Sequence, residues 1–473
     1  MGEIAPSVSD ELSTPRRNRQ AYARYVFWVM FAISFLNYLD RNVLAGAANV
    51  VAKELGFGLD GIGQISSAFL VVYTLCAVPL GIWADRARRK DVVATCVAVW
   101  SLATALTALV TGFTTLFLSR MVLGIGEAGY FPAGTALLSD CFSREKRSRI
   151  MSWWSVAQLV GILVGFGVGG AVAGLYTGSW RLLFLFTGIP GLLLAWLVWR
   201  LREPRRNEAD EEEAALNPEL LSAESVAAES PPLSLISPNV VSQFRTLLRI
   251  RTLMVLIIMQ IFAYFMLGVS TIFLPTYLQQ KDTFGLSSGT AGIYAGVIIV
   301  VAGMAGTVAG GYMADMLNRR HTGARVLVCG IGFLISAPAF AITMLTHNLL
   351  IFTLFFIVTA FLVTVYQGPS TAATQDVVPS VLRASSVALT LLIAHLLGDA
   401  FAPALIGGLA TSFDPTHGHH FLQGMAGQDL SVAMLVTCTP ALVLAGLVGV
   451  LGARWMASDV AAAEQADRLA RSA

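Results

Sequence analysis

The sequence predicts an all-α membrane protein in which twelve transmembrane helices form two pseudo-symmetric bundles of six. An apolar composition, twelve long apolar stretches and a motif repeated in the two halves predict this fold. The 473 residues are 56% apolar and 13% charged, with a mean hydropathy of +0.69, far above the balance of a soluble domain. Crossing about 30 Å of hydrocarbon takes roughly 20 apolar residues in a helix. We therefore expect membrane lipids around the chain and no nucleic-acid partner.

The twelve predicted spans follow one another with short connections, except for one long polar gap after the sixth. This gap combines an acidic run at 208–213 with several prolines, as expected of a linker between domains. We predict an N-terminal tail (1–24), a first bundle (25–201), a linker (202–250), a second bundle (251–456) and a C-terminal tail (457–473). The spans cover residues 25–50, 61–84, 92–112, 114–138, 150–174, 182–201, 253–278, 289–314, 325–345, 349–377, 385–411 and 431–455.

The positive charges predict the orientation of these spans. Of the 31 Lys and Arg residues, only Lys53, Arg181 and Lys281 fall in the loops that alternate with the basic ones, and two more, Arg41 and Arg120, lie deep within spans. Because basic loops remain in the cytoplasm, we expect both termini to be cytoplasmic. The N-terminal segment lacks the short apolar core and cleavage site of a signal peptide, so we expect the first span to stay. We expect a multi-pass protein of a bacterial inner membrane.

An internal repeat relates the two halves. The second span ends in Gly81-x-x-x-Asp85 followed by basic residues, and the eighth ends in Gly311-x-x-x-Asp315 in the same context. An Asp and an Arg seven residues apart follow both the fourth and the tenth span. Repeated units of this kind are typical of transporters. We predict that these residues form a latch holding one access state: Gly81, Asp85, Arg86, Arg89, Asp315, Arg319, Asp140, Arg147, Asp376 and Arg383.

The stretch from Gly81 to Lys90 resembles the loop signature of the major facilitator superfamily. The resemblance covers essentially all twelve predicted spans. It implies two bundles that rock around a central substrate cavity, exposing it alternately to each side of the membrane. It also implies a transporter, not an enzyme, that works as a monomer.

Four ionisable residues stand within the predicted spans of the first half. Asp40 and Arg41 lie in the first span, and Arg120 and Glu127 lie two helical turns apart on one face of the fourth. A charge at the bilayer centre costs about 2.5 to 3.5 kcal/mol even on the mild insertion scale, so each needs a partner or a function. We predict Asp40 as the chief proton-coupling site and Glu127 as a second. Arg41 and Arg120 would be charge partners or anchors for a substrate anion.

Other polar and aromatic residues of the spans are candidates for the cavity wall. His395 and Asp399 lie one turn apart in the eleventh span, where a histidine can titrate near neutral pH. The fifth span is rich in glycine, which allows close helix packing; it resembles the glycine-rich motif of antiporters, with Phe166 where that motif has proline. The candidates are Asn37, Tyr38, Tyr130, Tyr264, Tyr366, Gln367, His395 and Asp399.

Three segments together resemble the spinster family. They are Asn37-Tyr-Leu-Asp40-Arg41, the run from Arg120 to Ala128 with its Gly-x-Gly-Glu, and His395-Leu-Leu-Gly-Asp399-Ala. Eukaryotic members of that family export lipids such as sphingosine 1-phosphate and lysophospholipids, and the family is regarded as proton-linked. The resemblance implies a proton-coupled exporter whose substrate is an amphipathic lipid or a similar organic anion.

The same residues leave an alternative open, because Tyr38-x-Asp40-Arg41 and Gly126-Glu127-Ala-Gly-Tyr130 also resemble the anion:cation symporters. Those take up organic anions such as sugar acids. A membrane enzyme would need a nucleophile with a base or a metal cluster, and the sequence offers only a histidine cluster at His417, His419 and His420. The five cysteines have no paired spacing. We therefore expect no cofactor and no metal site.

Overall fold

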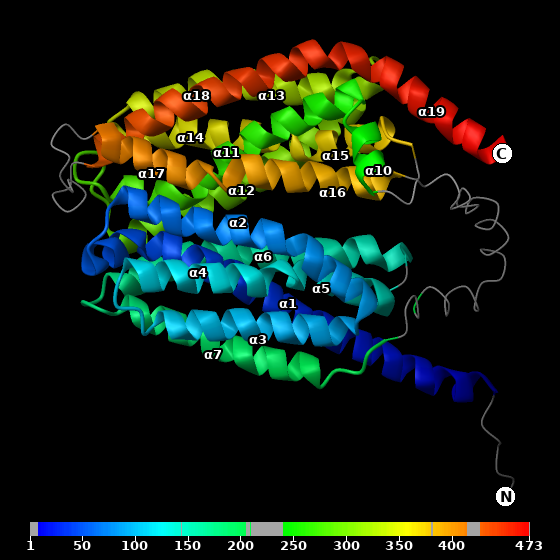
Figure 1. The fold of residues 1–473 in the computed structure, drawn as a ribbon, viewed down its shortest axis with the longest axis horizontal. Helices are drawn as coiled ribbons and strands as arrows, with labels where there is room; N and C mark the ends of the chain where they lie inside the picture. Colours follow the sequence, from blue (N-terminus) through cyan, green and yellow to red (C-terminus); the bar gives the residue numbers. More distant parts are fainter. Residues whose placement is uncertain are drawn as a thin grey trace, which may run out of the picture.

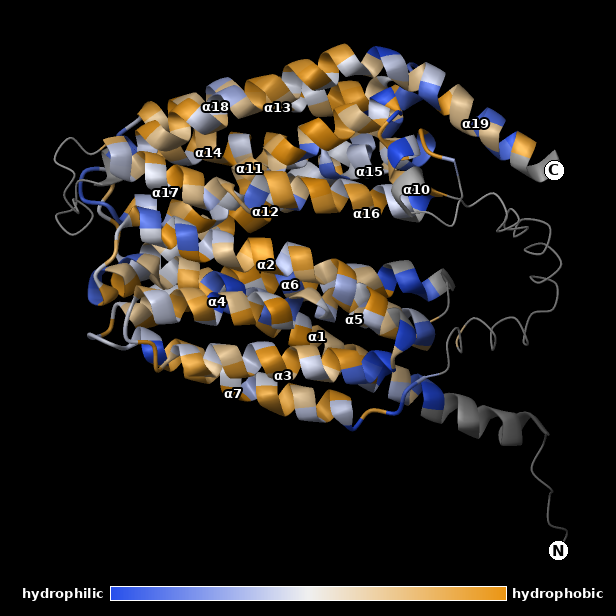
Figure 2. Cartoon of the chain, in the orientation of Figure 1, coloured by the Kyte–Doolittle hydropathy of each residue, from blue (hydrophilic) through white to orange (hydrophobic). Residues whose placement is uncertain are grey.

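A computed structural model shows helices packed side by side in two groups (Figure 1). It describes residues 8–142, 144–204, 209, 240–379, 382–413 and 426–472, without the side chains of some of them, Asp85 among these. Within this part of the chain, ten helical segments are long and apolar enough to cross a membrane. The other two predicted spans correspond to α1 (Val8–Leu55) and to the pair α4 (Phe113–Ala128) and α5 (Tyr130–Cys141). Figure 2 shows apolar helices with polar residues gathered toward their ends. The all-helical membrane fold is thus confirmed.

The first group of helices, called here the first half, comprises α1 to α7. The second half comprises α10 to α19. The remaining bounds in the first half are α2 (Leu59–Arg86), α3 (Arg89–Thr107), α6 (Arg144–Ala173) and α7 (Trp180–Trp199). Those in the second half are α10 (Val240–Leu247), α11 (Arg251–Gln279), α12 (Ser288–Asn318), α13 (Ala324–Leu345), α14 (Leu349–Thr364), α15 (Gln367–Asp376), α16 (Arg383–Ala394), a π-helical turn (His395–Asp399), α17 (Ala402–Phe413), α18 (Ala426–Gly452), a 3₁₀ turn (Ala453–Trp455) and α19 (Met456–Ser472).

Prolines break one predicted span in each half. Pro132 stands just after the break between α4 and α5, and Pro369 stands just after the break between α14 and α15. Proline has no N–H to donate, and its ring clashes with the carbonyl four residues earlier, so the helix bends or breaks there. The repeated position of these breaks extends the internal repeat from sequence to structure.

Glycines of α6 explain why this helix can pack closely against two others. A side chain at Gly161, Gly165 or Gly169 would collide with backbone carbonyls of α1, those of Phe35, Leu39 and Val43. On another face, Gly170 lies against the carbonyl of Ser288 in α12, and Gly292 of α12 lies against that of Phe166. Small residues at such positions allow helix backbones in a membrane to approach closely. α6 therefore connects its own half to the second half.

The two halves meet near one end of the bundle. Besides the contact between α6 and α12, Gly63 of α2 lies against the carbonyl of Pro403, and Gly407 of α17 lies against that of Leu59. The backbone N–H of Ala404 also donates to Oγ of Ser67 over 3.0 Å. These contacts all lie at the end where α1 finishes and α2 begins, called here the sealed end.

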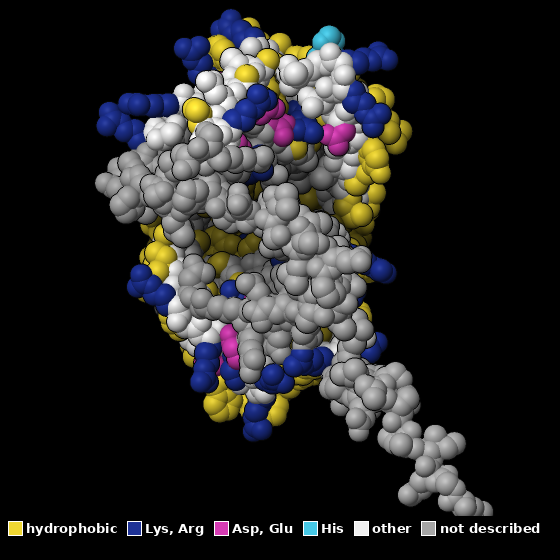
Figure 3. All heavy atoms as spheres, turned by 90° about the vertical axis from the view of Figure 1, so that its right-hand side faces the viewer, with side chains coloured by type: hydrophobic (Ala, Val, Ile, Leu, Met, Phe, Trp, Pro, Cys, Tyr) yellow, Lys and Arg dark blue, Asp and Glu magenta, His cyan; other side chains and the backbone are white. Residues whose placement is uncertain are grey.

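The other end carries the start of α1, the end of α7 and the start of α11, and is called here the linker end (Figure 1). Viewed from this side, Lys and Arg side chains lie around the edge of the described surface (Figure 3). A hollow with hydrophobic side chains at its base lies between the halves (Figure 3). Most of the predicted linker lies outside the described residues, so the predicted domain boundaries stay predictions.

Candidate functional site

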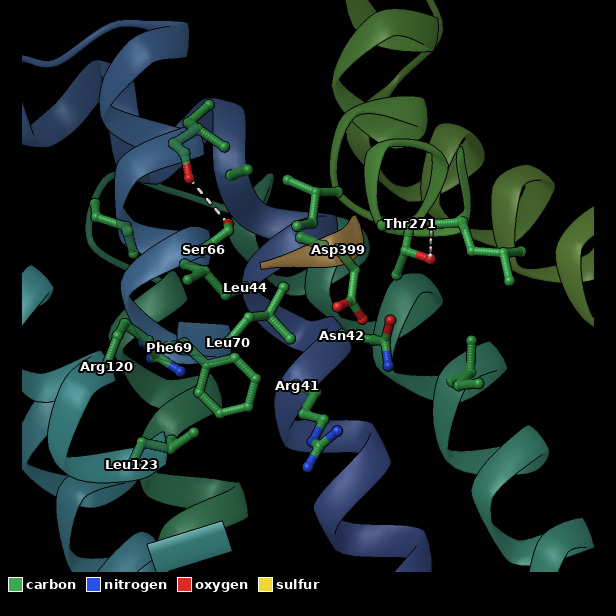
Figure 4. A pocket seen from close by; sticks show the side chains of 18 of the residues that line it. Arg41, Asn42, Leu44, Ser66, Phe69, Leu70, Arg120, Leu123, Thr271 and Asp399 are labelled. Carbon is green, nitrogen blue, oxygen red and sulfur yellow. Dashed lines mark hydrogen bonds between the residues drawn. The ribbon is translucent and has the colours of Figure 1, made fainter. Parts of the chain in front are cut away.

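A central cavity of about 300 Å³ lies between the two halves. Helices α1, α2, α4 and α6 line it from the first half, and α11, α12 and the π-helical turn line it from the second. Its wall is mostly aliphatic and aromatic, but four ionisable residues belong to it: Arg41, Arg120, His395 and Asp399. Figure 4 shows Arg41, Arg120 and Asp399 on separate elements around this space. Opposite charges are thus placed on the two halves, cations on the first and a carboxylate on the second.

Arg41 joins the cavity to a buried carboxylate. Its Nε forms an ion pair with Oε2 of Glu127, at the end of α4. The guanidinium also lies over the ring of Tyr73 at 4.5 Å and over that of Phe69 at 5.3 Å, in the range of cation–π attraction. Glu127 is 1% exposed, and its Oε1 has no hydrogen-bond partner among the described residues. The pair has the features of a site where a proton or a ligand can replace one ionic partner.

Asp40 is adjacent to Arg41 in sequence but faces away from the cavity. Its carboxylate accepts hydrogen bonds from Thr104 on α3 and from Thr187 on α7, the latter over 3.1 Å. It is 1% exposed, and it lines neither the central cavity nor the two further spaces described below. Successive residues of a helix point about 100° apart, so one of two neighbours can face the cavity while the other faces the bundle interior. The proton-coupling role of Asp40 stays a prediction.

Arg120 lies between Asp40 and the Arg41–Glu127 pair. Its guanidinium lies 4.8 Å from the ring of Phe184, and one of its nitrogens is 3.5 Å from Oγ1 of Thr107. Its charge acts on both Asp40 and Glu127. Nε of Arg120 has no hydrogen-bond partner among the described residues. Because it also lines the cavity, it is placed to meet an anionic group there.

In the second half, His395 and Asp399 form a pair within the π-helical turn. Nδ1 of His395 is 2.9 Å from Oδ2 of Asp399, and the imidazole packs edge-on to the ring of Tyr264 at 4.4 Å. Glycines allow this approach, because a side chain at Gly268 of α11 would meet Cβ of Asp399 at 2.8 Å. Single π-helical turns within α-helices often occur at functional sites.

A second space, called here the polar chamber, has a volume of about 420 Å³. Tyr38 and Tyr264 line both this chamber and the central cavity. Of the other predicted cavity residues, Tyr366 and Gln367 also line the chamber. Asn37 and Tyr130 do not: both are 2% exposed, and the hydroxyl of Tyr130 donates to the carbonyl of Met30 over 3.3 Å. A side pocket of about 530 Å³ between α6, α11, α12 and α14 shares Leu267, Thr271 and Ile299 with the central cavity.

The predicted latch residues gather at the linker end, within each half. Arg89 at the start of α3 forms an ion pair with Asp140 at the end of α5. In the second half, Arg325 at the start of α13 forms ion pairs with Asp376 and, over 3.1 Å, with Asp315. The pairs are equivalent, since Arg89 precedes Arg325 by the same number of residues as Asp140 precedes Asp376.

The second Arg of each motif also repeats its contact. Arg147 donates to the carbonyl of Ser139 over 2.8 Å, and Arg383 donates to that of Gln375 over 3.1 Å. Gly81, Arg86 and Arg319 also lie at this end, and the side chain of Asp85 lies outside the described ones. These contacts stay within one half, so a latch between the halves stays a prediction.

The sequence did not predict several residues of the site. Arg325 could have been found from its equal spacing with Arg89, whereas Thr104, Thr187 and Tyr73 carry no sequence signal of their own. Within the described residues, no three His, Cys, Asp or Glu side chains gather as a metal site. The cluster at His417, His419 and His420 lies outside those residues.

Comparisons with known proteins agree with this architecture. Residues 30–403 match the family described as Major Facilitator Superfamily. "Protein spinster" of Drosophila melanogaster is 25% identical over 390 residues, 81% of this chain and 61% of that protein. The "Probable L-galactonate transporter" of Escherichia coli (strain K12) is 30% identical over 298 residues, 61% of each chain. This chain thus spans about three fifths of the length of either relative.

A solved structure is similar in fold. It is the crystal structure of a bacterial homolog to the human lysosomal transporter Spinster, in an inward-facing and unoccupied conformation. The two superimpose with a TM-score of 0.79 at 23% sequence identity, covering 93% of this chain and 98% of the other.

Proposed function

Because the chain belongs to the Major Facilitator Superfamily and is a spinster-like secondary transporter, we propose that it exports an amphipathic substrate in exchange for protons. The observation that supports this most is the cavity between the halves, mostly apolar yet lined by Arg41, Arg120, His395 and Asp399. An amphipathic molecule needs such a combination of surfaces. In the contacts described above, the two halves meet only at the sealed end, as alternating access requires.

The linker end faces the cytoplasm in this proposal, so substrate enters the cavity from the cytoplasm. The sealed end then opens while the linker end closes, and substrate leaves on the far side. The reciprocal glycine contacts between α2 and α17, and between α6 and α12, are the surfaces that must separate. The apolar side pocket next to α14 offers room for part of an acyl chain.

Proton coupling is assigned to the pair of Glu127 with Arg41, ahead of Asp40. Arg41 lines the cavity and Glu127 is its ionic partner, so either a proton on the carboxylate or a ligand group can disrupt the pair. A substrate hydroxyl or amine that bonds to Glu127 competes with the proton, and this competition gives exchange. Asp40 is a second proton site, shielded from the cavity by its threonine partners.

The alternative is a proton-coupled symporter that takes up organic anions such as sugar acids. The similarity to the probable L-galactonate transporter favours it. In that case an anion takes Arg41 while Glu127 holds a proton, so both ions move together. The two proposals therefore differ in the direction of the pH gradient that drives substrate accumulation.

Flux in proteoliposomes tests the proposal. Labelled sphingosine 1-phosphate and a labelled sugar acid are each presented with the pH gradient in either direction. Exchange predicts that lipid moves toward the more acidic compartment as protons move the other way. Accumulation of the sugar acid alone, driven in the same direction as the protons, would establish the symporter instead.

A further inference from the structure

We propose that the polar chamber binds an uncharged, hydroxyl-rich part of the substrate, such as a sugar or polyol group. This rests on the proposed transport function and narrows its substrate class. The group can belong to a lipid headgroup or to a small sugar acid, because the chemistry that the chamber recognises is the same in both. The charged residues that line the central cavity around Arg41 do not themselves call for such a group.

The chamber differs from the central cavity in carrying no formal charge. The described residues around it include tyrosine, glutamine, serine and threonine side chains from α1, α6, α11, α15 and α16, and none of them is Asp, Glu, Lys, Arg or His. A charged group there would meet no counter-charge, which is unfavourable wherever the wall displaces its water. An uncharged polar group that finds hydrogen-bond partners does not incur this cost.

The threonines present acceptors to the chamber. The hydroxyl of Thr371 donates to the carbonyl of Gln367 over 2.9 Å, and that of Thr374 donates to the carbonyl of Ser370 over 2.8 Å. Thr390 donates in the same way to Ser386 over 2.7 Å. Since each hydroxyl has one proton and this proton is used within the helix, only the oxygen lone pairs remain available to a ligand.

Other side chains present donors. Nε2 of Gln260 donates one proton to Oγ of Ser370 over 3.3 Å, which leaves its second proton available. Oγ1 of Thr307 lies 3.0 Å from the carbonyl of Gly303 and 3.1 Å from Oε1 of Gln367, so these two acceptors share its one proton. The amide nitrogen of Gln367 donates to no described group and is available to a ligand. Tyr264 and Tyr366 also line the chamber, and their hydroxyls have no hydrogen-bond partner among the described residues.

This mixture of donors and acceptors matches a hydroxyl group. A hydroxyl both donates and accepts, whereas a phosphate or carboxylate only accepts and an ammonium group only donates. An ionised group would thus leave part of the chamber wall unpaired, a penalty that strongly disfavours the wrong ligand. Several neighbouring hydroxyls on one ligand would satisfy the wall from several helices at once.

The position of the chamber explains how such a group could be part of a larger substrate. Tyr38 and Tyr264 stand where the chamber and the central cavity meet. A ligand with its hydroxyls in the chamber would place its next atoms beside Arg41 or Asp399. The remainder would lie among the apolar residues of the central cavity.

Equilibrium binding to the full-length protein in lipid nanodiscs tests this inference with two pairs of labelled ligands. Glucosylsphingosine and sphingosine 1-phosphate share a sphingoid chain, but only the first carries a sugar. D-gluconate and hexanoate share six carbons and a carboxylate, but only the first carries hydroxyls along its chain. We expect the hydroxylated member to bind at least about ten-fold more tightly in one pair or both, because the other member cannot form several of the hydrogen bonds.

Two variants locate that preference in the chamber. Thr374→Val and Tyr366→Phe should each weaken the hydroxylated ligand by about three- to ten-fold and change its partner ligand by less than about two-fold. Thr343→Val is the matched control. It makes the same change in a buried threonine of α13 whose hydroxyl also bonds within its helix, to Ala339 over 2.9 Å, and it should leave all binding unchanged.

Equal or tighter binding of the member without the sugar or hydroxyls, in both pairs, would overturn the inference. So would an equal loss for both members in Thr374→Val, or binding of none of the four ligands. Preference for gluconate with no lipid binding supports the chamber inference and contradicts lipid export. Tight binding and flux of sphingosine 1-phosphate, without preference for the hydroxylated member in either pair, supports lipid export and contradicts the chamber inference.

Discussion

Arg41 contacts the cavity, a buried carboxylate and aromatic rings at the same time, which makes its shape as important as its charge. The planar guanidinium stacks over Tyr73 while its Nε reaches Glu127. A lysine keeps the charge but not the stacking or the fixed geometry of the donors. A conservative change should therefore be damaging at this residue.

We expect Arg41→Lys to lower proteoliposome flux about ten-fold, since both the stacking and the ion-pair geometry are lost. Arg181→Lys is the control. Arg181 also stacks on an aromatic ring, that of Trp180 at 4.3 Å, and lies 3.7 Å from Glu54, but it does not line the cavity. Equal losses in the two variants, or none in Arg41→Lys, would contradict a functional role for Arg41.

The ion pairs at the linker end are equivalent in position but not in burial. The Asp140 side chain is 3% exposed, whereas that of Asp376 is 35% exposed. Removing a cation from beside a buried carboxylate is more destabilising than removing one from an exposed pair, which contributes about 0 to 1 kcal/mol. We expect Arg89→Gln to lower Tm in detergent at least about twice as much as Arg325→Gln. A larger shift for Arg325→Gln would show that burial does not set the strength of these pairs.

The residues of the site could be predicted from the sequence only in part. Charged residues within apolar spans drew attention to Asp40, Arg41, Arg120 and Glu127, because such charges need a reason. The sequence could not decide which of Asp40 and Arg41 faces the cavity, since that depends on how α1 packs against α3 and α7. In the polar chamber, the sequence singled out tyrosines and Gln367 but not Gln260 or the threonines, because uncharged polar residues in a span are common.

At the scale of elements, glycine spacing proved more informative than hydropathy. The predicted glycine-rich span is the helix that approaches both α1 and α12. The breaks before Pro132 and Pro369 lie inside predicted spans, because a hydropathy pattern reports length and burial in lipid but not helix continuity. The helix α19 was expected only as a polar tail, since it lacks the apolar length of a span.

A pair of adjacent glycines in α17 tests the seal between α2 and α17. A side chain at Gly407 would overlap the carbonyl of Leu59, whereas a side chain at Gly408 meets nothing within 4 Å. Gly407→Ala should therefore keep the sealed end from closing, lower flux about ten-fold and expose a cysteine introduced at Ser66 to an impermeant thiol reagent from that side. Gly408→Ala makes the same change in helix propensity and should do neither. Identical behaviour of the two variants would rule out this contact as part of the gate.

On the scale of the whole molecule, charge asymmetry and fold agree on two distinct ends. The basic residues between spans gather at the linker end, where Figure 3 shows them around the hollow between the halves. From the positive-inside rule, we expect this end to lie in the cytoplasm. Substrate would then reach the cavity from the cytoplasm in the conformation described.

Protease access tests this orientation directly. A cleavage site inserted after Ser472 should be cut in inverted membrane vesicles and protected in intact spheroplasts. A site inserted in the loop between α13 and α14, next to His347, should show the reverse pattern. Protection of the C-terminal site in inverted vesicles would place the linker end outside and reverse the proposed direction of transport.

In the proposed mechanism, the Arg41–Glu127 pair couples proton movement to alternating access. The most direct measurement compares Glu127→Gln with the native protein in two proteoliposome assays, accumulation driven by a pH gradient and exchange of labelled for unlabelled substrate without a gradient. We expect the variant to lose at least about 90% of driven accumulation while keeping exchange, because the amide can support substrate movement but cannot carry the proton. Asp40→Asn should reduce driven accumulation less. Driven accumulation that is unchanged in Glu127→Gln would contradict the account.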